Sequence, residues 1–387
     1  MNFQEIKEQD GKYILHTYGR VDAALVKGKN ARAWDADGKE YIDFTSGIGV
    51  NALGYSDPGW AAAVSKQAGE IQHLCNYYYS PQNTALAEAL SKASGMAQAF
   101  FCNSGAEANE CAIKIARKYG EKRGAHRILT LHNSFHGRTL TTLAATGQDS
   151  FHKDFLPLTE GFLYGEANDL ADVEQKMDDS VCAVLIETVQ GEGGVVPMDE
   201  DFVQGLAELC KEKDVLLMID EVQTGVGRTG SFYSYQGYHI LPDVVTTAKG
   251  LAGGLPIGAC LVNEKLRDIL KPGQQGSTFG GNPVVCAGAL EVLRRVNDPE
   301  FLREVTEKGE YLTKKLEAME QVEIVRGKGL MLGVKLKGKD AHDVLTECAE
   351  EGLLILTAKD LVRFLPPLTI AKADMDEGLA IFEKVIA

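Results

Sequence analysis

The sequence lacks the features that would place it in a membrane, outside the cell or on a nucleic acid. No apolar run approaches the roughly 20 residues of a membrane span, and the polar, acidic start "MNFQEIKEQDGKYILHTYGR" has no signal-peptide core. The eight cysteines stand singly without a C-x-x-C pair, which disfavours disulfides and metal clusters and favours a cytoplasmic protein. Basic residues number 40 against 55 acidic ones, too few for nucleic-acid or anionic-membrane binding. Small molecules, including anions held at local cationic sites, remain as partners.

Length and composition predict two globular domains. The 387 residues are 44% hydrophobic and 25% charged, as in folded proteins, but they exceed what one simple core usually serves. Short apolar runs alternate with amphipathic segments such as 201–214, which is typical of a mostly parallel sheet covered on both faces. The expected strands are residues 99–102, 127–132, 182–187, 215–221, 243–248 and 257–262.

The two ends of the chain differ from this pattern. Asp37-Gly38 is a tight-turn signal inside a predicted hairpin at 25–44. From residue 322 onward, short strands mix with helices. We therefore expect an N-terminal segment that packs with the small domain, a large α/β domain, and a small α+β domain, at residues 1–50, 51–285 and 286–387.

A lysine follows one of the predicted buried strands. Lys249 ends the run "PDVVTTAK" and precedes glycines at 250, 253 and 254, which let other groups approach closely. An amine in an apolar, tightly packed site has a lowered pKa and can form a Schiff base with a carbonyl. A single lysine is more simply explained as a surface side chain, so this interpretation depends on its neighbours.

Two further features supply what an aldehyde cofactor needs. Asp220 and Glu221 end the predicted strand "LLMIDE", at the sheet edge where ligands of α/β proteins bind, although structural ion pairs also occur there. Ser104 and Glu107 have capping-box spacing at a helix start that suits a phosphate, although an ordinary strand–helix junction looks similar. An amine, an acid and an anion site are together the requirements of pyridoxal phosphate (PLP).

A dinucleotide site is the alternative from a different class. Gly225, Gly227 and Gly230 have G-x-G-x-x-G spacing, and Asp243 lies at a suitable distance for a ribose-binding acid. The glycines precede "SFYSYQGY", an aromatic, turn-like stretch, where the fingerprint requires a helix. This context disfavours an NAD(P)-dependent oxidoreductase.

The stretch "LHNSFHGRT" carries two histidines, an aromatic residue and an arginine. His132 and His136 are four residues apart, but no carboxylate accompanies them at zinc-enzyme spacing and Gly137 follows at once, so we predict no metal. Phe135 is better explained as a ring-stacking aromatic and Arg138 as a carboxylate clamp. Without the other motifs, they would be interpreted as a core Phe and a surface Arg.

Together the motifs "NSGAEANE", "SFHGRT", "QGEGG", "DEVQTGVGRTG", "AKGLAGGLPIGA" and "GSTFGGNP" resemble those of the class III (ornithine-type) aminotransferases. The resemblance extends from about residue 13 to the end. It implies the fold-type I PLP architecture, an α/β fold with a mostly parallel sheet in a large domain and a smaller α+β domain. Thr188 and Gln275 depart from commoner family forms, which have proline and histidine there.

The resemblance implies a role for each residue of a cofactor site. Lys249 would form the Schiff base and carry the proton of the reaction, and Asp220 would keep the pyridine nitrogen protonated. Val222 and Phe135 would pack on opposite faces of the ring, and Gln223 would bond the ring hydroxyl. The whole implied set comprises Ser104, Gly105, Ala106, Phe135, Asp220, Glu221, Val222, Gln223, Lys249 and Thr278.

The phosphate site implied by the resemblance involves two subunits. Gly105 and Ala106 would hold the phosphate on their helix N-terminus. Ser277 and Thr278 would reach the neighbouring subunit's site, where Thr278 would complete the phosphate cradle. The resemblance therefore implies an obligate homodimer.

Two arginines and a glutamate are implied for the substrates, together with Ser277. Arg138 would bind the α-carboxylate of an acylated ornithine, and Arg363 would bind that of glutamate or 2-oxoglutarate. Glu192 would pair with Arg363 while the longer diamine occupies the site. One site must accept both a dicarboxylate and an amine at the far end of a chain, and a switchable Glu–Arg pair resolves that conflict.

The length and "VRFLPPL" resemble those of the bacterial members that act on N2-acetylornithine. The implied reaction moves its terminal amino group to 2-oxoglutarate, giving N-acetylglutamate 5-semialdehyde and glutamate in arginine biosynthesis. Free ornithine, succinylornithine, succinyldiaminopimelate and 4-aminobutyrate remain open as donors, as does PLP binding without turnover. Residues around Tyr18 and Arg20 are expected to distinguish acetylated from free ornithine.

Overall fold

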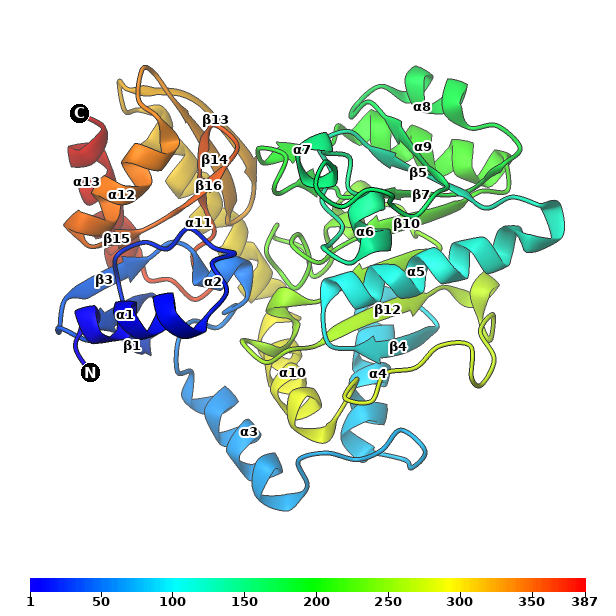
Figure 1. Cartoon of the computed structure of the whole chain (residues 1–387), viewed down its shortest axis with the longest axis horizontal. Helices are drawn as coiled ribbons and strands as arrows, with labels where there is room; N and C mark the ends of the chain where they lie inside the picture. Colours follow the sequence, from blue (N-terminus) through cyan, green and yellow to red (C-terminus); the bar gives the residue numbers. More distant parts are fainter.

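The computed structural model describes residues 1–387 and is built around a seven-stranded sheet (Figure 1). The strand order is β4 (Gln98–Cys102), β12 (Gly258–Val262), β11 (Val244–Thr247), β10 (Leu216–Asp220), β7 (Val181–Ile186), β5 (Arg127–Leu131) and β6 (Phe162–Gly165). Only β12 runs antiparallel to its neighbours. All six predicted strands are confirmed in this sheet, and the edge strand β6 was not predicted.

Helices cover this sheet on both faces because its central strands are apolar on both sides. Every residue of β7, β10 and β12 is buried. Alternate strand residues such as Leu216 and Met218 pack with the apolar face of α5 (Gly105–Gly120). Leu217 and Ile219 belong instead to the core that includes α9 (Glu200–Glu212). The two-residue alternation of strand side chains thus produces the predicted three-layer arrangement.

Two smaller sheets lie beside the large one, on the left in Figure 1. The C-terminal sheet is antiparallel, with the order β13 (Val322–Lys328), β14 (Met331–Leu336), β17 (Leu361–Phe364) and β16 (Leu356–Ala358). The N-terminal sheet has the order β1 (Leu25–Lys29), β2 (Arg32–Asp35), β3 (Glu40–Asp43) and β15 (Leu353–Leu354). The parallel pairing of β15 with β3 joins the beginning of the chain to its last third.

The predicted hairpin at 25–44 is a three-stranded meander. Asp37 and Gly38 form the turn between β2 and β3, as expected, and Gly38 has a φ of +89°. A second turn at Asn30 and Ala31 separates β1 from β2, and it was missed because Asn30 is followed by no glycine. Asn30 itself has a φ of +50°, a conformation that asparagine tolerates better than most residues.

Four helices begin at the same kind of dipeptide, an Asp, Ser or Asn followed by proline. In each the first residue caps the helix with its side-chain oxygen and the proline occupies the first turn, where its missing N–H costs nothing. These helices are α3 (Pro58–Glu70), α4 (Pro81–Ser94), α10 (Pro283–Val296) and α11 (Pro299–Glu317). The expected domain boundary at residue 285 therefore lies inside α10.

The remaining elements are short or peripheral. They are α1 (Phe3–Tyr13), α2 (Ser46–Gly49), α6 (Leu140–Ala145), α7 (Asp149–His152), α8 (Leu170–Lys176), α12 (Ala341–Glu351), α13 (Lys372–Ile386), β8 (Val189–Gln190) and β9 (Val196–Pro197). Short 3-10 turns occur at Glu121–Arg123, Ser234–Tyr238, Lys249–Ala252 and Glu264–Leu266. None of the helices combines the length and apolarity needed to cross a lipid bilayer.

Candidate active site

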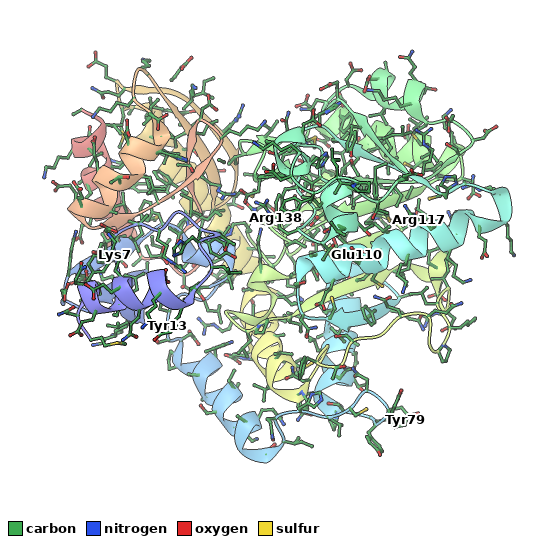
Figure 2. All side chains as sticks on the ribbon, in the orientation of Figure 1. Lys7, Tyr13, Tyr79, Glu110, Arg117 and Arg138 are labelled. Carbon is green, nitrogen blue, oxygen red and sulfur yellow. The ribbon has the colours of Figure 1, made fainter.

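A cavity of about 420 Å³ lies where β10 and β11 end and α5 begins. The carboxyl ends of parallel strands and a helix N-terminus meet there, as in other α/β ligand sites. Figure 2 places Arg138 at the boundary between the large sheet and the two smaller ones, and Arg138 is part of the cavity wall. The predicted site residues that line the cavity are Ser104, Gly105, Ala106, Phe135, Arg138, Asp220, Val222, Gln223 and Lys249.

Lys249 enters the cavity from a 3-10 turn that begins directly after β11. Its φ is +39°, a backbone conformation that side-chain-bearing residues rarely adopt and that is often found at active sites. Burial of the amine by the surrounding protein lowers the pKa of Lys249, and the nearby carboxylate of Glu192 opposes this effect. A lowered pKa favours the neutral amine, which is the nucleophilic form.

Asp220, the last residue of β10, is buried and held by three groups. Its Oδ2 accepts a hydrogen bond from Asn109 Nδ2 at 2.8 Å and lies 2.8 Å from His136 Nδ1. Its Oδ1 accepts a hydrogen bond from the Val222 N–H at 3.0 Å. Asn109 is itself oriented by Thr246, whose hydroxyl donates to Asn109 Oδ1 at 2.7 Å. The network fixes the direction of the Asp220 carboxylate at the cavity wall.

Two members of this network were missed in the sequence. Asn109 stands in the "NSGAEANE" motif, one turn into α5, and His136 was considered only as a metal ligand. His136 is buried and its Nε2 has no hydrogen-bond partner in the chain. His132 lies elsewhere, against the ring of Tyr164 with ring centres 5.7 Å apart. The structure holds no group of three or more His, Cys, Asp or Glu arranged for a metal.

The N-terminus of α5 differs in detail from the predicted capping box. Ser104 Oγ accepts a hydrogen bond from the Glu107 N–H at 3.2 Å, as expected. The Glu107 carboxylate accepts from the Asn103 N–H at 2.6 Å, one residue earlier than the box requires. The N–H groups of Gly105 and Ala106 have no acceptor within the chain and face the cavity end of the helix. This geometry suits an anion.

Gly105 is required by its close contact with Val222. A Cβ at position 105 would lie 2.7 Å from Val222 Cγ1, closer than real side chains approach. Val222 in turn directly follows Glu221 and lines the cavity, as does Phe135. A glycine here lets the helix start and the valine side chain share one wall of the cavity.

Arg138 and Phe135 lie side by side at the cavity. The Arg138 guanidinium carbon is 5.3 Å from the Phe135 ring centre and 4.1 Å from that of Phe151, within cation–π range. The Phe135 N–H donates to Glu187 Oε2 at 2.9 Å. Glu187, another residue missed in the sequence, lines the cavity, and burial raises its pKa to about 7.

Arg363, Glu192 and Gln223 form a second polar cluster next to the cavity. Arg363 is buried on β17, and its NH1 donates to Glu192 Oε1 at 2.6 Å and to Gln223 Oε1 at 3.2 Å. Burial alone would raise the pKa of Glu192, but the positive charge and hydrogen bond of Arg363 bring it below its usual value. Gln223 Nε2 also donates to Glu192 Oε1 at 3.4 Å. Gln223 therefore lines the cavity and at the same time bonds to both Arg363 and Glu192.

Besides Glu192 and Arg363, three predicted residues lie outside the cavity. Glu221 does not face it: its carboxylate accepts from Thr224 Oγ1 at 2.6 Å and from the Tyr235 N–H at 2.9 Å, on the opposite side of the strand end. Ser277 Oγ accepts from Asn103 Nδ2 at 3.1 Å, next to the start of α5. Thr278 is exposed and does not line the cavity of its own chain.

The glycine-rich stretch after Gln223 is not a dinucleotide turn. It leads into the 3-10 turn Ser234–Tyr238 and no α-helix begins after it, because four aromatic rings at 232–238 are buried there. Gly227 has a φ of +83°, and a Cβ on it would lie 2.5 Å from Val296 Cγ1 of α10. The glycines therefore serve close packing against neighbouring helices.

Comparison with known proteins decides the family. The model of the family "Aminotransferase class-III" matches residues 13–386, almost the whole chain. The chain belongs to the class-III aminotransferases. An acetylornithine aminotransferase from Haemophilus ducreyi is 48% identical, with 100% of both chains covered. A succinylornithine transaminase from Yersinia enterocolitica is 43% identical over 95% of this chain and 93% of that one.

The fold is that of the same family. A solved structure of ornithine aminotransferase from Toxoplasma gondii superposes with a TM-score of 0.93 at 30% identity, covering 99% of this chain and 94% of that one. That structure is described with partial occupancy of PLP at its active site. The α/β fold predicted from the motifs is thereby confirmed.

The class-III aminotransferases are PLP-dependent transaminases, and the residues of this cavity fit that cofactor. Lys249 offers an amine whose pKa is lowered, Asp220 offers a buried, fixed carboxylate, and Gly105 and Ala106 offer N–H groups without acceptors. Gly105 has no side chain, and a Cβ there would collide with Val222, so the glycine leaves this helix N-terminus accessible from the cavity. An amine, an acid and an anion site thus converge on one cavity.

Proposed function

We propose that this chain transfers the terminal amino group of N2-acetylornithine to 2-oxoglutarate, giving N-acetylglutamate 5-semialdehyde and glutamate, in arginine biosynthesis. Full-length relatives at 41–48% identity that are named acetylornithine aminotransferases support the donor. The assignment of the acceptor rests on the ion pair of the buried Arg363 with Glu192, which lies beside a cavity lined by Arg138 and Lys249. Two arginines at one cavity suit a dicarboxylate.

PLP supplies an aldehyde that takes up the amino group and a ring that delocalises negative charge. We assign Lys249 Nζ to binding that aldehyde and to moving the proton at the carbon that carries the amine, since its lowered pKa favours the neutral base. We assign Asp220 to the pyridine nitrogen, because its carboxylate is buried and oriented by Asn109 and His136. Gly105 and Ala106 would hold the phosphate, with Ser104 fixing the helix start.

The two substrates place opposite demands on Arg363. While acetylornithine presents its far-end amine, the Arg363 charge has no carboxylate to bind and is neutralised by Glu192, as in the present geometry. Arg138 binds the α-carboxylate of this donor. When a dicarboxylate enters, Glu192 releases Arg363, which then binds the α-carboxylate of 2-oxoglutarate or glutamate. Gln223, bonded to both members of the pair, is placed to stabilise either arrangement.

We also propose a homodimer in which Ser277 and Thr278 reach the partner's site. Thr278 is exposed and lies outside the cavity of its own chain, so a role at the phosphate requires a second copy. Tyr79 points away from the rest of the chain on the loop between α3 and α4 (Figure 2), and Tyr77 and Phe279 are also strongly exposed. Exposed aromatic groups of this size are typical of interfaces. All eight cysteines are free, which supports a cytoplasmic location.

The test is a donor panel with 2-oxoglutarate as acceptor. N2-acetylornithine should give the highest kcat/KM among acetylornithine, succinylornithine, ornithine, succinyldiaminopimelate and 4-aminobutyrate. Succinylornithine is the second candidate, because a relative at 43% identity is named for it. A higher kcat/KM for free ornithine or 4-aminobutyrate would overturn the proposal. The purified protein should show a visible absorbance band of the cofactor, and this band should bleach when the amine donor is added. A protein that lacks such a band would contradict turnover through PLP.

A further inference from the structure

The arginine of the "TGVGRTG" stretch, Arg228, has no role in the site described above. It is 2% exposed, so its guanidinium has no access to water. Burial lowers the pKa of Arg228 to about 9, and the carboxylate of Asp43 opposes that shift. A buried cation of this kind is costly and persists only where its hydrogen bonds are satisfied by fixed acceptors.

The acceptors of Arg228 all lie on parts of the chain distant in sequence. Its NH1 donates to the carbonyl oxygens of Leu330 at 2.9 Å and Pro366 at 2.5 Å, and its NH2 donates to Ser46 Oγ at 3.3 Å. The Leu330 N–H donates back to the Arg228 carbonyl at 3.0 Å. Ser46 Oγ in turn donates to the Leu365 carbonyl at 2.6 Å. Arg228 therefore ties the loop after β10 to the N-terminal segment and to the C-terminal sheet.

These acceptors flank the strand pair that carries Arg363. Gly333 of β14 is the register partner of Arg363 of β17. Leu330 directly precedes β14 and Pro366 follows β17 by two residues, and because the two strands are antiparallel, Arg228 binds both of them at the same end, the one near Arg363. Arg228 is also five residues beyond Gln223, whose Oε1 accepts from Arg363 NH1 at 3.2 Å. The loop after β10 therefore contacts the strand pair through Arg228 and the side chain of Arg363 through Gln223.

We propose that Arg228 is a positioning residue for the dicarboxylate half-reaction, fixing β14 and β17 so that Arg363 reaches Glu192, Gln223 and the substrate carboxylate. The inference rests on the proposed function of Arg363. Arg138, assigned to the other substrate, lies on the loop before α6 and makes no contact with Arg228 or its acceptors. Removing Arg228 should therefore affect the two substrates unequally.

The experiment compares Arg228→Met and Arg228→Lys with the wild type as holoenzymes. In a ping-pong reaction each kcat/KM reports on one half-reaction, and Arg228→Met should lower that of 2-oxoglutarate about tenfold or more while changing that of acetylornithine less than about threefold. Calorimetry should show a matching loss of affinity for glutarate, a dicarboxylate without a keto group. Arg228→Lys keeps a charge and should recover part of both losses.

Arg32→Met is the matched control. Arg32 ties the N-terminal sheet to α13 through Asp374 and Glu377, and none of its hydrogen bonds involves Arg228, the acceptors of Arg228 or Arg363, so its loss tests destabilisation. It should leave the ratio of the two kcat/KM values unchanged. If Arg228→Met does not fold, Ser46→Ala removes one acceptor and should shift the ratio in the same direction. Equal losses for both substrates, or an unchanged ratio in every folded variant, would overturn the inference. A wild type that does not use 2-oxoglutarate would instead contradict the proposed function.

Discussion

At the scale of single residues, the role that a side chain can take depends on its burial and on the face of the strand from which it projects. Asp220 and Glu221 are adjacent acids at one strand end, and both are buried. Asp220 faces the cavity and is oriented by three groups. Glu221 faces the other way, to Thr224 and Tyr235. The sequence predicted both in the site, but successive side chains of a strand point to opposite faces, so only one can reach it.

Lys249→Ala should lower transamination by at least about 10³-fold, because it removes both the amine that binds the aldehyde and the proton carrier. Borohydride treatment of the variant should fix no cofactor to the chain, as measured by mass spectrometry. Lys328→Ala is the matched control: burial also lowers the pKa of Lys328, yet it lies over the Tyr238 ring outside the cavity. A covalently fixed cofactor in Lys249→Ala would show that another amine binds it.

Glu221→Gln should change how stability depends on pH. Burial raises the folded-state pKa of Glu221 to about 7 from an ordinary 4.5, so its contribution is fully present below about pH 4.5 and is lost as pH rises through 7, at most about 3 kcal/mol. Urea unfolding at pH 5 and pH 8 should show a larger loss in the wild type than in Glu221→Gln. Equal losses in both proteins would mean that Glu221 is ionised in the folded state at pH 5.

At the scale of elements, the start of α5 decides how an anion is held. The sequence predicts a helix start at Ser104, and the structure confirms it. The sequence could not show that the Glu107 carboxylate accepts from the N–H of Asn103 and not from that of Ser104, because the same residues at the same positions allow either hydrogen bond. It also could not show the packing of Gly105 against Val222, which lies more than 100 residues away in sequence.

Gly105→Ala should weaken PLP binding by about 5-fold to 150-fold, because overpacking a tight contact costs about 1–3 kcal/mol. The structural reason is the 2.7 Å approach of the new Cβ to Val222 Cγ1. Titration of the cofactor-free protein with PLP measures the effect. Adding Val222→Ala should restore part of the affinity, and Gly11→Ala, on α1 with open space around it, should change nothing. Unchanged affinity in Gly105→Ala would show that the contact relaxes freely.

At the scale of the whole molecule, the functional groups come from the large sheet, from loops distant in sequence and from the C-terminal sheet. The N-terminal sheet takes its strand β15 from the last third of the chain, and the C-terminal sheet carries Arg363 to the edge of the cavity formed by the large sheet. The proposed boundaries at residues 50 and 285 stay predictions. The second of them falls within α10, which packs against α3 and α4 as well as against the turn that carries Lys249.

Mixing two inactive variants tests the proposed dimer. Lys249→Ala and Thr278→Glu should each be nearly inactive, the second because a negative charge would face the partner's phosphate site. In a mixed dimer one site would carry both changes and the other neither, so random pairing should restore about a quarter of wild-type activity. Co-expression with two affinity tags isolates the mixed dimer. No recovery would mean that Thr278 serves its own subunit or that the dimer is wrong.

The sequence by itself determined the strands, the helix starts and the positions of Lys249 and Asp220. These features depend on local patterns: apolar runs, capping side chains, and the rule that functional groups follow strand ends. Only the tertiary structure decided how the groups meet. The family resemblance implied the pair of Glu192 and Arg363, which are 171 residues apart, but nothing in the sequence indicated the contact of Arg228 with Pro366, 138 residues away. Such pairs form because separate segments pack on one another, and no local pattern in either segment encodes its partner.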